Sequence, residues 1–461
     1  MASNFAVLGV AEVICRGISM VVTLTLAQRL GASGYGRVEF AFNVVFWLVL
    51  IVRDCFETIV TREIARHPQL TRALVAHVLA VKLSFALSLF VLLLGIGFTS
   101  YANRVDLAIL GLYGLLLIST ALGIDFVYRG TERMGLVAVS LCLRTLVYCF
   151  GVTFTVRDLS SILLVPVWLA AGEFCGIALV WLCFTKQFGV VRPVFNLRFL
   201  RVFLERGRSV VLVQLSQAVL ISADFIIVGF RSPWSDLGRY GAPHRMVAAL
   251  MAFGLIFQQV VFPTLSRSLR LPDESGRAFL DKAVRILMLG FVPVTVGGTV
   301  LADSLVRFLL PAEYHSSGFL LALGIWRAPL LSLSFLYQSA LISMNRESAG
   351  LRLLVGGAIA SGPCIAIFVR LFGQPGACVA ANLIGLTLVV AGHYCLGRER
   401  RAPAAHHHLW KPLVAAAVMV PCCLWLEKTH VTVAILGGAI VYLAALWALG
   451  VREDLGMSRA G

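Results

Sequence analysis

Charged residues are scarce in this sequence: Asp, Glu, Lys and Arg make up 13% of its 461 residues, whereas apolar residues make up 59%. Soluble domains typically contain about 25% charged and about 45–50% apolar residues. A helix crosses the hydrocarbon core of a bilayer with about 20 apolar residues, and such stretches recur from Phe5 to Val451. The composition therefore predicts an all-α polytopic membrane protein, and it excludes a soluble enzyme or a protein held by a single anchor.

The sequence also lacks the short motifs of several enzyme classes. It contains no GxxxxGK[ST] phosphate loop, no GxSxG nucleophile elbow and no HExxH helix. Its eleven cysteines include no CxxC pair, so we expect packing residues rather than a zinc site or a disulfide framework. The run from His406 to His408 is expected to form a polar cytoplasmic turn. We therefore expect no enzyme activity, no metal and no cofactor, with energy for any transport coming from a proton or sodium gradient.

Apolar runs are long enough for about fourteen transmembrane helices. A basic cytoplasmic connector at 185–208 divides them, which predicts an N-terminal lobe at 1–184 with spans 1 to 6 and a C-terminal lobe at 209–396 with spans 7 to 12. A terminal pair of helices, spans 13 and 14, follows at 397–461. The spans are placed near 5–28, 38–60, 74–98, 106–127, 135–156, 162–184, 209–230, 240–263, 279–301, 317–343, 351–369, 376–396, 412–427 and 431–450.

The basic residues favour one set of loops. Of the 39 Lys and Arg residues, about 23 fall in the loops after even-numbered spans or at the C-terminus, and about 9 fall in the loops after odd-numbered spans. Positive loops stay in the cytoplasm, so both termini are predicted to be cytoplasmic in a cell (inner) membrane. The formal net charge of +16 thus reflects membrane topology, and no nucleic-acid partner is expected.

The connector has the pattern of an amphipathic helix. Its aromatic and leucine side chains fall on one helical face and its charged side chains on the other. This pattern is typical of a helix that lies on an anionic leaflet, with membrane lipids as the partner, and a solvated linker helix is the alternative. The apolar positions are Phe195, Phe199, Leu200 and Phe203, and the charged positions are Arg198, Arg201, Glu205 and Arg208.

We single out thirteen charged residues inside predicted spans. Even on the insertion scale with the lowest values, a central Arg or Lys that faces lipid costs about 2.5–3.5 kcal/mol. They must therefore face one another or a hydrated cavity. The basic residues are Arg16, Arg53, Lys82, Arg144, Arg245, Arg285 and Arg327. The acidic residues are Glu12, Asp54, Glu57, Asp125, Glu173 and Asp224.

The deepest of these positions are the candidate site residues. A guanidinium group offers a planar fork of donors to a phosphate or carboxylate, so an excess of buried arginines indicates an anionic cargo. The carboxylates are candidates for ion coupling or gating. The expected cavity residues are Arg16, Arg53, Arg144, Arg245 and Arg327, and the expected coupling or gating residues are Glu12, Asp54, Glu57 and Asp224.

Purely structural roles are the alternative for several of these residues. Glu12 with Arg16, and Arg53 with Glu57, are spaced i,i+4 and share a helix face. Asp54 and Asp224 could instead each pair with an arginine of a neighbouring helix. Lys82, Arg285 and Asp125 lie close enough to span ends to reach the interface. Glu173 has no partner that the sequence identifies.

Several motifs resemble those of a known family. Leu26 to Gly36 (LAQRLGASGYG) is similar to a pattern LAxxLGxxxYG between the first two spans, and Thr61 to Arg66 (TREIAR) is similar to tRxxA after the second. Ala223 to Gly229 (ADFIIVG) and Leu237 to Ala242 (LGRYGA) resemble DxxxlG and GxYxxA. Leu309 to Tyr314 resembles fGxxY, with Leu-Pro in place of Phe-Gly. On these motifs the chain resembles the polysaccharide-transporter branch of the multidrug, oligosaccharidyl-lipid and polysaccharide exporter superfamily.

This resemblance implies two six-helix lobes around a central cavity. It also implies a flippase that moves polyprenyl-pyrophosphate-linked oligosaccharide repeat units from the cytoplasmic to the outer leaflet by alternating access, for polysaccharide biosynthesis. The expected partners are the lipid-linked oligosaccharide and the polysaccharide polymerase machinery. The buried arginines fit the pyrophosphate of such a cargo.

Three other functions remain open at this stage. A flippase for lipid-linked peptidoglycan precursors is the first alternative, and an ion-coupled multidrug exporter is the second. The second usually carries cations, which basic residues in a cavity oppose. A membrane scaffold without transport is the third, although a scaffold has no need of charges deep in the membrane.

Overall fold

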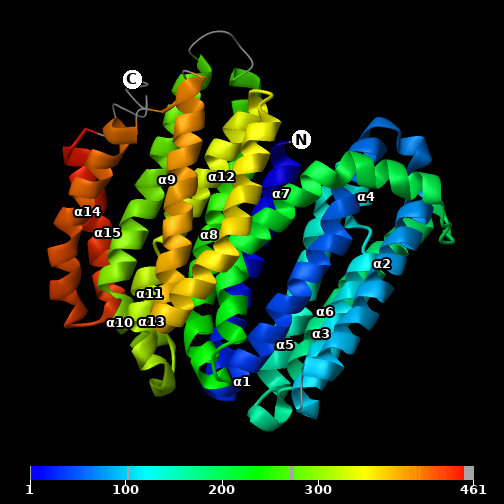
Figure 1. Ribbon diagram of the computed structural model, residues 1–461, viewed down its shortest axis with the longest axis horizontal. Coiled ribbons are helices and arrows are strands. Elements are labelled where there is room, and N and C mark those ends of the chain that lie inside the picture. Colours follow the sequence, from blue (N-terminus) through cyan, green and yellow to red (C-terminus); the bar gives the residue numbers. More distant parts are fainter. Residues whose placement is uncertain (1, 101–102, 270–274, 400, 404, 451–461) are drawn as a thin grey trace. The chain divides into compact units, whose positions relative to one another are not determined.

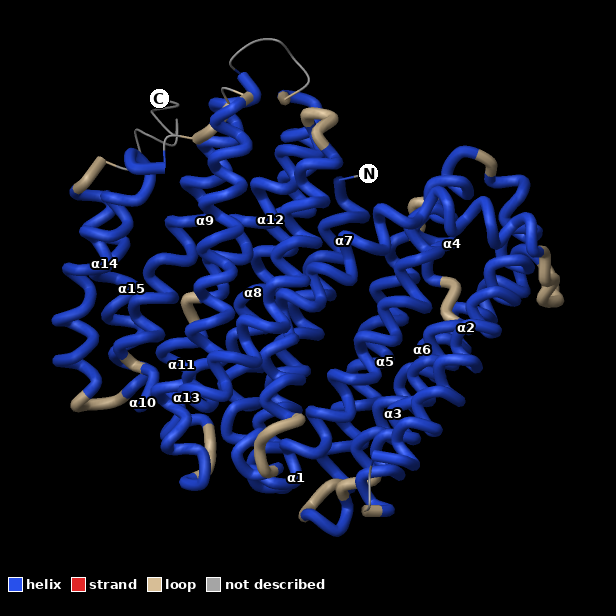
Figure 2. Tube along the Cα trace, in the orientation of Figure 1, coloured by secondary structure: helices blue, strands red, loops and turns tan. Residues whose placement is uncertain are grey.

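The structure is a computed structural model that describes residues 2–100, 103–269, 275–399, 401–403 and 405–450. Every regular element in these residues is a helix, and no strand occurs among them (Figure 2). Because long apolar helices satisfy all their backbone hydrogen bonds internally, they are suited to a bilayer. The predicted all-α polytopic fold class is confirmed.

Twelve helical segments among the described residues are long and apolar enough to cross a membrane. Two of them are much longer than one crossing requires. Val7–Arg66 contains 60 residues and Glu347–Arg398 contains 52, whereas a helix needs about 20 to cross the hydrocarbon core. Each is interrupted by one non-helical glycine, Gly31 (φ 64°) and Gly373 (φ 65°), in a backbone conformation that favours glycine. The predicted count of fourteen spans stays a prediction.

The chain forms two compact units, of which the first comprises Met1–Ala218 and Ser232–Gly238. In this unit α5 packs against α6 and α1, and α2 packs against α3. The bounds of its helices are α1 (Ala2–Arg66), η1 (Pro68–Leu70), α2 (Thr71–Ser100), α3 (Arg104–Leu122), α4 (Asp125–Gly130), α5 (Met134–Thr155), η2 (Leu159–Ser161), α6 (Leu164–Phe188) and the first part of α7 (Leu197–Gly229).

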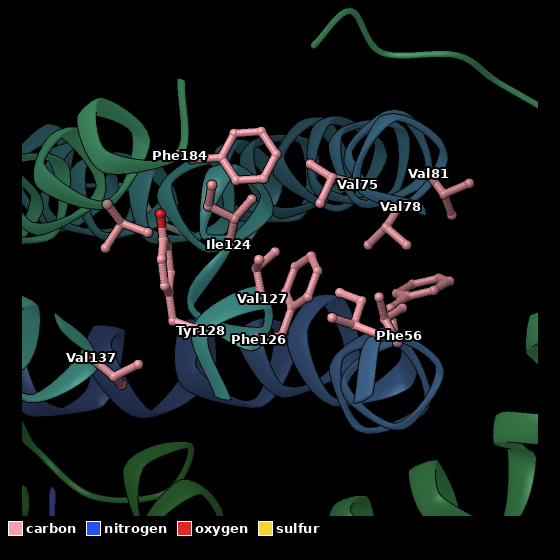
Figure 3. Close-up of a cluster of buried hydrophobic side chains, with 13 residues drawn as sticks. Phe56, Val75, Val78, Val81, Ile124, Phe126, Val127, Tyr128, Val137 and Phe184 are labelled. Atoms are coloured by element: carbon pink, nitrogen blue, oxygen red, sulfur yellow. The ribbon is translucent and has the colours of Figure 1, made fainter. Parts of the chain in front are cut away.

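A buried apolar cluster in the first unit surrounds the short helix α4. Figure 3 shows Ile124, Phe126 and Val127 together with Phe56 of α1 and Phe184 of α6. Valines of α2 complete this side of the cluster. The members of this cluster are almost completely buried, so they form the apolar core of the first unit.

The second unit comprises Val219–Arg231 and Arg239–Gly461. Here α12 packs against α13, and the last two helices pack against each other and against α9 (Figure 1). The Tyr442 hydroxyl donates a hydrogen bond to the Leu289 carbonyl at 3.0 Å, which fastens α15 to α9. The bounds are α8 (Trp234–Ser268), α9 (Ser275–Val300), α10 (Ala302–Leu309), η3 (Ala312–Ser317), α11 (Gly318–Gly324), α12 (Arg327–Ser343), α13 (Glu347–Arg398), α14 (Ala405–Glu427) and α15 (Val431–Ala448).

Two expectations about polar segments have different outcomes. The three histidines at 406–408 lie in α14, which begins at Ala405, so the prediction of a turn is wrong; their side chains lie outside the described residues. The second half of the connector is the start of α7, with an exposed ion pair between Arg201 and Glu205 at 3.0 Å. The side chains of 197–200 and 202–204 are outside the described part, so the lipid-facing role of the connector stays a prediction.

Candidate functional site

A group of charged side chains, most of them buried or half-buried, joins five helices of the first unit. Lys82 on α2 has a side chain with no exposed surface, and its Nζ donates to Glu57 on α1 at 2.9 Å. The same Nζ donates to the Gly123 carbonyl at 3.1 Å. This carbonyl is available because α3 ends at Leu122 and α4 starts at Asp125, which leaves the last carbonyls of α3 without helical partners.

Arg144 on α5 holds two carboxylates at once. Its guanidinium lies 2.7 Å from Asp125 on α4 and 3.0 Å from Glu173 on α6. Two glycines of α6 provide the room: a Cβ at Gly172 would overlap the Arg144 carbonyl, and a Cβ at Gly176 would overlap the Arg144 side chain. The pattern Gly-Glu-x-x-Gly from 172 to 176 thus fits α6 closely around one arginine.

Two more cations lie near these side chains, the half-buried Arg53 and the exposed Arg129, and we call the whole group the first ionic cluster. Arg53 interacts electrostatically with both Glu57 and Glu173, and Arg129 interacts electrostatically with Glu57. Four of the residues in this cluster are cations and three are carboxylates. Its members are Arg53, Glu57, Lys82, Asp125, Arg129, Arg144 and Glu173.

The depth of the first ionic cluster follows from helix length. Lys82 lies eleven residues after the start of α2, and Arg144 lies ten residues after the start of α5. At about 1.5 Å per residue, both are about 15 Å along their helices, or half of a hydrocarbon core of about 30 Å. The predicted interfacial position of Lys82 is therefore wrong, because this side chain is fully buried and paired with Glu57.

The other candidates of the first unit have different surroundings. Arg16 is exposed and Glu12 is half-buried, and the described residues contain no ion pair between them. The side chain of Asp54 lies outside the described residues. Arg53 and Glu57 do interact, but the close ion pair of Glu57 is with Lys82, 25 residues further along the chain.

A second group of buried polar residues lies in the second unit. Asp224 on α7 is 1% exposed, and its Oδ2 lies 2.8 Å from Nη2 of Arg327 on α12. The Tyr240 hydroxyl on α8 donates a hydrogen bond to the same Asp224 oxygen. The His244 Nε2 lies 3.6 Å from Asp224 Oδ1. We call Asp224, Tyr240, His244 and Arg327 the second ionic cluster.

This cluster borders a small cavity. The space for the centre of a water molecule is about 10 Å³, close to the volume that one water needs. Three lining atoms, Asp224 Oδ1, His244 Nδ1 and Asn382 Oδ1, have no hydrogen-bond partner among the described residues. Two of these are acceptors only, and His244 Nδ1 accepts when it carries no hydrogen.

Asp224 and Arg327 were predicted for different roles, ion coupling and cargo binding, and the structure brings them together as an ion pair. Pairing with an arginine was the structural alternative for Asp224. Arg245 is half-buried on α8, one residue after His244. Sequence reasoning missed Tyr240 and His244, although their i,i+4 spacing puts both on one face of α8. Among the described residues no group of three or more His, Cys, Asp or Glu is suited to a metal ion.

Comparison with known proteins supports the resemblance drawn from the motifs. The model of the family "Polysaccharide biosynthesis protein" matches residues 1–269, which is more than half of the chain. Comparison with curated protein sequences gives no match.

Several solved structures share the fold. A lipid II flippase, MurJ, in an inward closed conformation has a TM-score of 0.78 at 13% identity, covering 97% of this chain and 99% of the flippase. An inward-facing multidrug resistance MATE family transporter of the MOP superfamily has a TM-score of 0.67 at 12% identity, covering 84% and 94%. The Vibrio cholerae MATE transporter VcmN in its bent form has a TM-score of 0.55 at 13% identity, covering 87% and 100%.

Proposed function

Because this chain belongs to the polysaccharide biosynthesis protein family, we propose that it is a flippase for lipid-linked oligosaccharides. It moves polyprenyl-pyrophosphate-linked repeat units from the cytoplasmic to the outer leaflet of the cell membrane by alternating access. The family match and the fold of MOP superfamily transporters support a transporter rather than an enzyme.

The observation that carries the proposal is the grouping of cations in the first ionic cluster. Lys82 and Arg144 form ion pairs with its three carboxylates, and the half-buried Arg53 and the exposed Arg129 lie within electrostatic reach of Glu57. A guanidinium group offers a planar pair of donors that suits a pyrophosphate. In transporters that are built from repeats, the substrate site commonly lies near the bilayer midplane, where it can be reached from each side in turn.

Such a cargo needs a protein to cross the membrane because its saccharide is polar. Each hydroxyl taken into hydrocarbon without a hydrogen-bond partner costs about 4–8 kcal/mol, so a saccharide of several units does not cross unaided. A polar route lowers this cost, and the lipid tail stays in the bilayer. The second ionic cluster is proposed to couple this movement to a proton or sodium gradient, because moving one charge through 100 mV yields about 2.3 kcal/mol.

A lipid-linked peptidoglycan precursor flippase is the second candidate. The likeness to a lipid II flippase over 97% of the chain favours it, because its cargo carries the same kind of pyrophosphate. An ion-coupled multidrug exporter ranks third, since the cations of the first ionic cluster disfavour a cationic cargo.

Binding of purified protein to candidate cargoes separates these functions. Native mass spectrometry would compare a polyprenyl-pyrophosphate oligosaccharide, lipid II and a cationic dye. We expect the oligosaccharide to bind best, and Arg53→Ala to weaken it at least tenfold. The matched control is Arg201→Ala, which removes an exposed side chain that pairs with Glu205. Preference for lipid II would favour the second candidate, and preference for the dye would contradict both flippase functions.

A further inference from the structure

The hydrogen-bond geometry of His244 fixes which ring nitrogen carries the hydrogen. Its Nε2 lies 3.3 Å from the Ile221 carbonyl oxygen and 3.6 Å from Asp224 Oδ1. Both neighbours are acceptors, so Nε2 is the protonated nitrogen of the neutral ring. The opposite nitrogen, Nδ1, is then a bare acceptor. It is buried and has no hydrogen-bond partner among the described residues.

Arg327 Nη2 and the Tyr240 hydroxyl both contact Asp224 Oδ2, and His244 Nε2 lies 3.6 Å from Oδ1. A sodium ion needs several oxygen ligands, and among the described lining residues only two side-chain oxygens, Asp224 Oδ1 and Asn382 Oδ1, have no hydrogen-bond partner. A proton needs only one lone pair, and the buried Nδ1 of His244 supplies it beside a cavity for about one water.

We infer that His244 is the proton-binding residue of the second ionic cluster, and that the coupling ion of this transporter is therefore a proton. This inference rests on the proposed transport function. A hydronium ion in the cavity transfers its proton to the lone pair of Nδ1, so one O–H bond breaks, one N–H bond forms and a water molecule is left. The reverse transfer to water restores the neutral ring.

Protonation changes the charge balance around one carboxylate. Before it, Asp224 and Arg327 neutralise each other; afterwards, two cations compete for Asp224. The protonated ring of His244 attracts Asp224 Oδ1 more strongly. The ion pair between Arg327 on α12 and Asp224 on α7 becomes weaker as a result. Arg327 also donates to the Ile221 carbonyl at 3.2 Å, so both of its contacts to α7 lie beside His244. Proton binding thereby acts on the link between two helices.

Four charged or titratable side chains line the cavity together with His244. Asp224 comes from α7, Tyr240 from the same helix as His244, Arg327 from α12 and Cys378 from α13. The lining residues of α11, Leu320 and Gly324, carry no charge. Among these side-chain types, imidazole is the one that generally exchanges a proton near neutral pH.

The first test needs no cargo. Protein labelled with ¹⁵N-histidine in nanodiscs is titrated from pH 5 to pH 9, and the His244 signal is the one that His244→Gln removes. We expect this signal to titrate within the range, and Asp224→Asn to lower its proton affinity about tenfold. The control, His393→Gln on α13, removes a different signal. A His244 signal that stays constant over the range would overturn the inference.

The second test uses proteoliposomes with a fluorescent polyprenyl-pyrophosphate oligosaccharide. The measured quantity is the ratio of flipping rates with and without a pH gradient of 1.5 units. We expect a ratio of at least threefold for the wild type and for His393→Gln, and a ratio near one for His244→Gln. A wild-type ratio near one, or an unchanged ratio in His244→Gln, contradicts the proton site. Absence of all flipping by the wild type contradicts the proposed function, while the titration still decides the proton site.

Discussion

The guanidinium of Arg144 lies 3.0 Å from the carboxylate of Glu173, which is 29 residues away in the sequence. The same guanidinium holds Asp125 at 2.7 Å. One arginine therefore fixes the rotation of α4, α5 and α6 about their axes. Arg144 thus forms ion pairs with two of the three carboxylates in the first ionic cluster, and Lys82 forms one with the third.

Loss of the cation that faces Glu57 should destabilise the first unit. Lys82→Met removes the ammonium but keeps much of the side-chain volume, and it leaves Glu57 buried without its close partner. A broken buried ion pair typically costs about 3–5 kcal/mol. We expect a lower melting temperature in detergent, measured by scanning fluorimetry. The double variant Lys82→Met/Glu57→Gln should recover most of the loss, and equal melting of Lys82→Met and wild type would contradict this role.

The close fit of α6 around Arg144 gives a second prediction. Gly176→Ala adds a methyl group where the Arg144 side chain lies, and overpacking of this kind costs about 1–3 kcal/mol. The control is Gly135→Ala in α5, where an added Cβ meets nothing within 4 Å. We expect Gly176→Ala to lower the thermal unfolding temperature and Gly135→Ala to leave it unchanged. If both variants melt like the wild type, α6 does not approach α5 as closely as described.

The glycines of two sequence motifs meet within the first unit. A Cβ at Gly36 would overlap the Trp234 carbonyl oxygen, and one at Gly238 would overlap the Ala32 carbonyl oxygen. Phe40 and Trp234 pack edge to face beside them, with ring centroids 5.7 Å apart. Gly238→Ala should therefore reduce stability by about 1–3 kcal/mol. Gly95→Ala, in open space on α2, is the matched control, and unfolding curves that do not distinguish the two would refute the contact.

A pH effect is expected in the loop between α5 and α6. Hydrogen bonds from Ser160 and Ser161 to the exposed carboxylate of Asp158 hold the pKa of Asp158 below its usual value. A lowered pKa in the folded state means that this cap is present above about pH 4 and is lost as the pH falls further. Amide exchange of 158–161 should become faster, relative to its intrinsic rate, between pH 5 and pH 3. Asp158→Asn should remove that pH dependence, and an unchanged profile would contradict it.

The spans could be predicted from the sequence because the cost of exposing polar groups to lipid leaves apolar helices as the solution. The boundaries of α5 and α6 differ from the predicted 135–156 and 162–184 by a few residues. The need for buried charges to find partners could be predicted in the same way. The identity of those partners could not.

Pairings such as Lys82 with Glu57 depend on how each helix is rotated about its axis, and no local pattern encodes that rotation. The break between α3 and α4 was also missed, because Gly123 and Asp125 lie inside one predicted span at 106–127. That break supplies the carbonyl that Lys82 binds. His244 was missed because a single histidine in an apolar helix carries no distinctive signal until Asp224 is seen beside it.

The central claim is tested most directly by the flipping of a fluorescent polyprenyl-pyrophosphate oligosaccharide in proteoliposomes, followed by chemical quenching of the outer leaflet. We predict flipping well above protein-free vesicles for the wild type and for Arg201→Ala, and at least a tenfold lower rate for Arg53→Ala at equal protein incorporation. Wild-type vesicles that flip no pyrophosphate-linked saccharide, but move small cations along an ion gradient, would contradict the account.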